Sequence, residues 1–207
     1  SKEKAEQARW EIEAKRALAD VSTEEKFEVL EEIEENLQPD VVKVDLPART
    51  LILADDITDR YYANTEGARI HGTVPRVSLL FVLTVNEPGR GTIQRIEQHG
   101  EAGGWERLKD WNPPRLVSEE ARILSRVLRE GKQAPREELD LVLEPEVTGI
   151  ICHESCGHPQ EADRILGREA AQAGESYVKP DMIGYRVGTE AVTIVDDPTL
   201  LNSYGFY

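Results

Sequence analysis

Two of the four histidines in this 207-residue chain lie five residues apart, and a glutamate directly follows the first of them. The stretch reads His153-Glu154-Ser155-Cys156-Gly157-His158. In hydrolytic enzymes imidazole side chains hold Zn2+, and a nearby carboxylate can take a proton from the attacking water. The residue types are therefore compatible with a metal site in which His153 and His158 bind the ion and Glu154 is the general base.

The spacing of the two histidines does not suit a regular helix. The common zinc-peptidase motif places its histidines four residues apart on one helical face, whereas five residues separate two side chains by about 140°. Gly157 is conformationally permissive, and Pro159 lacks a backbone donor and crowds the carbonyl of Ser155. We therefore predict a π-type bulge or a helix break at 155–159. The residues alone leave open whether the histidine pair binds a metal or is structural.

The only two cysteines, Cys152 and Cys156, lie in the same stretch. If the stretch is helical, their Cβ atoms are too far apart for an unstrained disulfide, which predicts a reducing, cytoplasmic compartment. The two cysteines could join the histidines as soft metal ligands. Buried free cysteine acting as a small hydrophobic residue is the commoner role.

Composition and charge exclude several classes of protein. The net charge is −15 and no basic stripe is present, so we expect no nucleic-acid partner. No apolar run approaches the roughly 20 residues that span a bilayer, and the N-terminal residues lack an apolar signal core. The predicted protein is globular, with no membrane segment.

The first part of the chain combines helical and strand patterns. Helices are predicted at residues 3–19 and from Ser22, which forms a capping box with Glu25, to a stop at Pro39. Turn signals at 64–67 and 86–89 separate β-rich runs and indicate an antiparallel meander. The predicted strands are Val41–Val44, Thr50–Leu53, Arg60–Ala63, Val77–Val85 and Thr92–Ile96.

Further helices and strands are predicted downstream. Trp105–Trp111 is typical of a short helix, and Ser118 and Gly131 are expected to cap the ends of another. A helix is expected to begin at Pro145 and to carry the histidines, with short strands at Leu139–Leu143 and Val192–Val195. The predicted fold class is α+β: an antiparallel sheet covered on one face by helices, plus a motif-bearing active-site helix.

The histidine stretch, followed by Glu161 and Asp163, resembles the signature of the TldD/PmbA family of metallopeptidases. The histidine–glutamate–three residues–histidine pattern is similar to the metal-bearing, TldD-like subunits. The likeness extends through Leu141–Gly149, Asn64–Gly67 and Val195–Pro198. It implies hydrolysis of peptide bonds in small or unfolded polypeptides, with Zn2+ as cofactor.

The resemblance also implies roles and boundaries. His153 and His158 become zinc ligands, Glu154 the general base, and Glu161 and Asp163 supporting residues around the ligands. The family's third ligand is a cysteine far downstream, which neither Cys152 nor Cys156 matches. The chain is accordingly expected to be a partial N-terminal domain, with the sheet and its helices in about 1–137 and the active-site helix segment in about 138–207. The C-terminal domain is expected to be absent, and the isolated chain inactive.

The resemblance implies a dimer, formed either by two identical subunits or with a PmbA-like (TldE-like) partner. A competing hypothesis is a non-catalytic subunit that holds peptides or regulates an enzyme on the same scaffold. The presence of both histidines and Glu154 favours the enzyme, because a binding module has no chemical need for all three.

Overall fold

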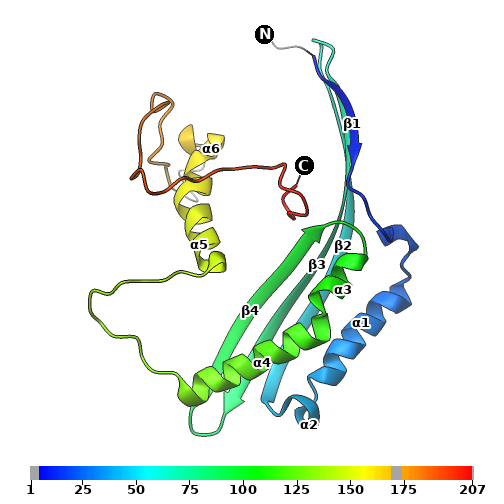
Figure 1. Cartoon of the computed structure of the whole chain (residues 1–207), viewed down its shortest axis with the longest axis vertical. Coiled ribbons are helices and arrows are strands. Elements are labelled where there is room, and N and C mark those ends of the chain that lie inside the picture. The colour runs from blue at the N-terminus through cyan, green and yellow to red at the C-terminus, as the bar shows by residue number, and fades with distance from the viewer. Residues whose placement is uncertain (1–4, 169–173, 207) are drawn as a thin grey trace. The chain divides into compact units, whose positions relative to one another are not determined.

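The computed structural model describes residues 5–168 and 174–206 (Figure 1). The chain forms two compact units. The sheet unit comprises Ser1–Gln133 together with Pro198–Tyr207, and the histidine unit comprises Ala134–Asp197.

A long central strand organises the sheet unit. Strand β3 (Arg69–Glu87) pairs along its length with β2 (Asp45–Ala63), antiparallel. On its other edge β3 pairs antiparallel with β4 (Gly91–Ala102) and parallel with the short β1 (Gln7–Glu11). The predicted antiparallel sheet within residues 41–97 is confirmed.

Strand β2 is longer than the sequence pattern suggested. The predicted strands Thr50–Leu53 and Arg60–Ala63 are parts of one strand, because pairing with β3 continues through the polar segment 55–59. The carboxylates of that segment find partners: Asp55 pairs with Lys26, and Asp59 lies 2.6 Å from the His71 ring nitrogen. Acidic residues are therefore tolerated inside a strand when side chains that can donate hydrogen bonds meet them.

Two local predictions in the first part are wrong. Within 3–19, the described residues form β1 and a 3-10 turn at Leu18–Asp20 rather than a helix. The ring of Trp10 packs so closely over Gly72 that a Cβ there would lie 2.2 Å from it, so tertiary packing overrides helix propensity. The predicted strand at Val41–Val44 is also wrong, because Pro39 begins the short helix α2 (Pro39–Val42).

Helices cover one face of the sheet. Helices α1 (Thr23–Asn36) and α4 (Pro113–Glu130) pack against each other and along the sheet (Figure 1). Alternate β3 side chains face them and are fully buried, as period-two burial requires. The core includes Ile33, Leu37, Leu79, Phe81, Leu83, Val85, Val117 and Ala121.

Helix ends agree with the predicted caps in part. The Ser22 hydroxyl accepts a hydrogen bond from Glu25 N, which confirms the start of α1. Helix α3 (Glu106–Trp111) is also confirmed. Ser118 does not begin the next helix, because α4 starts at Pro113, a favourable first helical residue, and Ser118 is buried inside it. Gly131 ends α4 as predicted.

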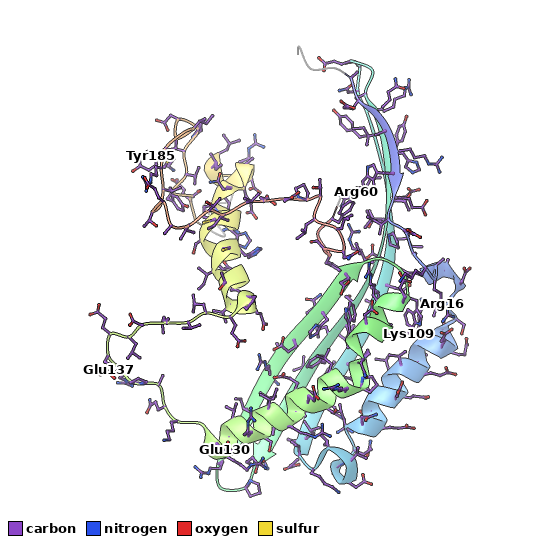
Figure 2. All side chains as sticks on the ribbon, viewed as in Figure 1. Arg16, Arg60, Lys109, Glu130, Glu137 and Tyr185 are labelled. Carbon is purple, nitrogen blue, oxygen red and sulfur yellow. The ribbon has the colours of Figure 1, made fainter. Side chains whose placement is uncertain are left out.

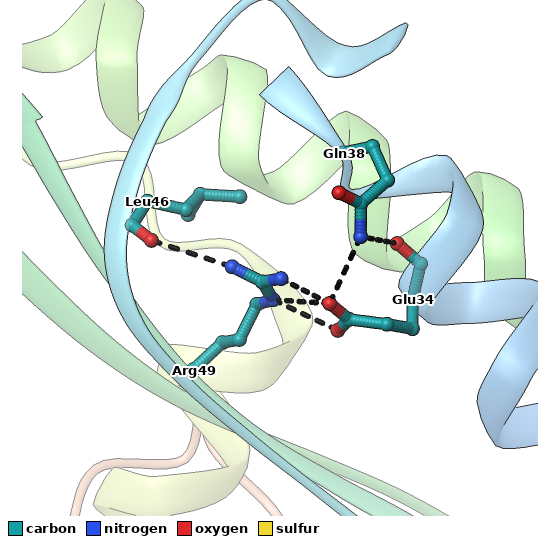
Figure 3. A network of polar contacts seen from close by, with 4 residues as sticks. All are labelled: Glu34, Gln38, Leu46 and Arg49. Atoms are coloured by element: carbon teal, nitrogen blue, oxygen red, sulfur yellow. Dashed lines mark hydrogen bonds and ion pairs between the residues drawn. The ribbon is translucent and has the colours of Figure 1, made fainter. Parts of the chain in front are cut away.

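A polar network fastens α1 to β2 (Figure 3). Arg49 binds the Glu34 carboxylate through two nitrogens, with Nε 2.8 Å from Oε2, and its guanidinium also donates to the Leu46 carbonyl. Gln38 donates to the same carboxylate. The hydrogen bonds from Arg49 lower the pKa of Glu34, so the pair stays charged at neutral pH.

Past Glu130 the chain runs through exposed residues, Glu137 among them, before it reaches the residues that carry the histidine motif (Figure 2). The predicted strands Leu139–Leu143 and Val192–Val195 are wrong, because neither run forms a strand in the described chain. Val142 is 99% exposed, so the apolar run reflects no buried strand. Among the described residues, no helix is long and apolar enough to cross a membrane.

Candidate metal centre

The histidine motif lies where one helix changes its winding. Helix α5 (Pro145–Cys152) has Pro145 as its first residue, as predicted. It continues into a π-helical turn, η2 (His153–Gly157), which we call the π-turn. A 3-10 turn, η3 (His158–Gln160), and a short helix, α6 (Ala162–Ile165), follow.

The π-turn explains the five-residue spacing. The backbone N–H of His158 donates to the carbonyl of His153, which is the five-residue hydrogen bond that defines π winding. This bond joins the two histidines and brings them onto one side of the chain. The predicted distortion near Gly157 is therefore confirmed, although the π-turn begins two residues before 155.

The side chains of His153, Glu154 and His158 converge. One potential ligand atom from each lies within 4.8 Å of the others. The Glu154 carboxylate lies 4.0 Å from His153 Nε2 and 3.9 Å from His158 Nε2. The two imidazole rings meet edge to face with centroids 4.3 Å apart.

Glu161 fixes the orientation of one imidazole. Its Oε1 lies 2.8 Å from His158 Nδ1, and its Oε2 lies 2.6 Å from Arg164 Nε. The hydrogen bond from His158 and the charge of Arg164 lower the pKa of the Glu161 carboxyl. An ionised carboxylate only accepts, so Nδ1 carries a proton, and in the neutral ring this tautomer leaves the lone pair of Nε2 for a metal ion.

Asp163 occupies a different position. Its carboxylate accepts from Arg164 N, and its carbonyl accepts from Arg168 N. These bonds stabilise the chain around α6. A supporting role of Asp163 at the histidines stays a prediction.

The two cysteines are free and half-buried. Neither is part of the group of potential metal ligands found among the described residues. Both line a cavity of about 1300 Å3 in the histidine unit, together with His153, His158 and apolar side chains from 182–195. The sequence pattern did not predict these cavity walls, because most of 182–195 lacks helical or strand periodicity and the strand predicted at Val192–Val195 does not form.

The donor set suits a divalent metal ion such as Zn2+. Two ligands that each bind one Zn2+ at about 2.1 Å can be no more than about 4.2 Å apart. The potential ligand atoms of the two imidazoles lie within 4.8 Å of each other, and small side-chain rotations would bring them within this limit. The side chains of His153 and Glu154 are 62% and 63% exposed, so an ion and a substrate can reach them.

Comparison with protein families covers both units. Residues 16–128 match the model of the PmbA/TldA metallopeptidase central domain, which is more than half of the chain. The chain belongs to the TldD/PmbA family. Residues 136–207 match the model of the C-terminal domain of these metallopeptidases. The family models thus name the two parts central and C-terminal, where the prediction from sequence named a partial N-terminal domain.

Three archaeal proteins named metalloproteases are similar to this TldD/PmbA family member. Those of Methanocaldococcus jannaschii, Methanothermobacter thermautotrophicus and Archaeoglobus fulgidus are 30%, 29% and 27% identical. The matches cover 91%, 95% and 98% of this chain, and 38%, 40% and 44% of the relatives. The chain therefore spans about two fifths of their length. No solved structure matches it significantly.

Proposed function

We propose that this chain carries the metal-binding part of a zinc-dependent peptidase of the TldD-like type. The convergence of His153, Glu154 and His158 at the π-turn carries the proposal. Membership of a metallopeptidase family and the names of the archaeal relatives support it. In this proposal the two imidazoles hold Zn2+ and Glu154 acts as the general base.

Each residue has a defined task in this chemistry. Bound zinc would polarise the scissile carbonyl and acidify the attacking water. Glu154 accepts the proton of that water on a carboxylate oxygen and returns it to the departing amine nitrogen. Because Glu154 lies about equally far from both imidazoles, it would stand close to a water bound to an ion that the imidazoles hold.

Glu161 keeps His158 ready to bind the ion. Its hydrogen bond to Nδ1 holds the ring in one tautomer and one orientation, with Nε2 on the side of Glu154. A carboxylate behind a ligating histidine also makes the imidazole a stronger donor. Arg164 in turn holds Glu161, so the support extends to α6.

The proposed substrates are small or unfolded polypeptides. The exposed general base and the large cavity beside the histidines suit an extended chain better than a folded surface. We further propose that the working protein is cytoplasmic and dimeric, either with itself or with a PmbA-like (TldE-like) partner. The free state of Cys152 and Cys156 supports a reducing compartment.

The test is metal removal from the complete protein. Stripping with a chelator is expected to abolish hydrolysis of an unstructured polypeptide, and one equivalent of Zn2+ is expected to restore it. Unfolded casein, followed by release of labelled fragments, is a suitable substrate. Peptide binding without cleavage, whether or not zinc is present, would favour the non-catalytic peptide-holding subunit instead.

A further inference from the structure

Pro159 leaves one carbonyl group of the π-turn without its usual helical partner. In an α-helix the carbonyl of Ser155 would accept from the backbone N–H of residue 159, but residue 159 is proline and has none. The hydroxyl of Tyr177 takes that place and donates to the Ser155 carbonyl at 3.2 Å. A side chain 22 residues away thus compensates for a donor that Pro159 removed.

The neighbouring Ser176 holds the other side of the same turn. Its hydroxyl donates to the carbonyl of Pro159 at 2.7 Å and accepts from Val178 N at 2.9 Å. Ser176 is only 7% exposed, and its own N–H donates to the carbonyl of Arg164. These hydrogen bonds satisfy both the donor and an acceptor site of the buried Ser176 hydroxyl, and they connect residues 176–178 to the turn.

Ser176 and Tyr177, which we call the clamp, therefore bind the chain on both sides of His158. One partner carbonyl lies three residues before His158 and the other one residue after it. His158 is the histidine whose position depends on the π winding, because its N–H makes the five-residue bond. If the turn rewound as a regular helix, the imidazoles would separate by about 140°.

We propose that Ser176 and Tyr177 are positioning residues of the metal site, which hold the π-turn so that both imidazoles face one ion. The inference rests on the proposed zinc site. Tyr177 is 51% exposed, and its hydroxyl contacts the turn through the hydrogen bond to the Ser155 carbonyl. The clamp acts through the backbone and touches neither the ion nor the substrate.

The first test is Tyr177→Phe in the complete protein, with Tyr185→Phe as the matched control from the same segment. Zinc affinity is measured by competition with a chromophoric chelator, and geometry by the visible spectrum of the Co2+ form. Tyr177→Phe is expected to weaken zinc binding about tenfold and to alter the Co2+ spectrum. Tyr185→Phe should change neither. Metal-free thermal unfolding, recorded in parallel, separates repositioning from loss of the fold.

A double-mutant cycle with Pro159→Ala provides the sharper test. Alanine restores a backbone N–H that can donate to the Ser155 carbonyl, so Tyr177 loses its special role. Pro159→Ala alone is expected to weaken zinc binding, because the turn can rewind, and adding Tyr177→Phe should cost little more. Equal losses from Tyr177→Phe in both backgrounds would overturn the clamp.

Two other results are decisive. If the wild type binds zinc tightly and Tyr177→Phe binds it equally well with an unchanged Co2+ spectrum, the clamp is wrong and the proposed function stands. If the wild type does not bind zinc, the proposed function fails, and the clamp fails with it.

Ser176→Ala, expected to weaken zinc binding at least as much as Tyr177→Phe, checks the second residue of the clamp.

Discussion

Glu154→Gln is expected to keep zinc bound and to lose nearly all peptide hydrolysis. The amide has almost the same shape as the carboxylate, so the imidazoles keep their arrangement. It cannot accept the proton of the attacking water, and proton transfer by a positioned base contributes roughly 10²–10⁴-fold to such reactions. We therefore expect kcat to fall by about that factor, with a much smaller change in KM.

The assay follows hydrolysis of an unstructured polypeptide by the complete protein, with zinc content measured in the same preparations. Glu146→Gln is the matched control, because Glu146 lies in the first turn of α5, away from the three converging side chains. It should retain full activity and full zinc. A fully active Glu154→Gln protein would end the assignment of Glu154 as the general base.

His158→Ala is expected to lose the metal itself. It removes one of the two imidazoles and leaves Glu161 without the ring that it orients. Loss of a supporting residue alone costs roughly 10–100-fold in metal affinity, so loss of a ligand should cost more than that. Hydrolysis should then be undetectable at stoichiometric zinc.

Zinc measured by elemental analysis after desalting checks this result. His71→Ala is the control, because His71 pairs with Asp59 in the sheet unit and is not one of the three converging side chains. It should retain zinc. A His158→Ala protein with undiminished zinc would mean that other side chains, such as Cys152 or Cys156, hold the ion.

Local sequence signals anticipated the winding of the histidine stretch well. The five-residue spacing, Gly157 and Pro159 together predicted a widened turn, and the structure contains a π-turn there. The start of α1 at its serine cap and the hairpin between β3 and β4 were predicted equally well from the sequence. In each case a residue within five positions along the chain supplies the physical cause.

The errors arise where distant parts of the chain decide the structure. The segment around Trp10 has helix-forming composition. It nevertheless pairs with an edge of β3, where Gly72 has no side chain to obstruct the Trp10 ring. The apolar runs Leu139–Leu143 and Val192–Val195 resemble strands but find no partner strand among the described residues.

The clamp could not be predicted from the sequence, for the same reason. Ser176 and Tyr177 are ordinary polar residues in an irregular segment, and their importance lies in two carbonyl groups 17 and 22 residues away. The contact between Glu161 and His158 was easier to predict from the sequence, because the two residues are only three positions apart. Its geometry still required the 3-10 turn at His158–Gln160.

X-ray absorption at the zinc edge of the complete protein tests the central claim most directly. We expect one zinc per chain, with scattering from two imidazole nitrogens at about 2.0–2.1 Å. The resemblance adds a cysteine sulfur at about 2.3 Å. The imidazole signal should weaken in His153→Ala and His158→Ala and persist in Glu154→Gln. Bound zinc without imidazole scattering, or a spectrum unchanged by loss of either histidine, would contradict the assignment of this site.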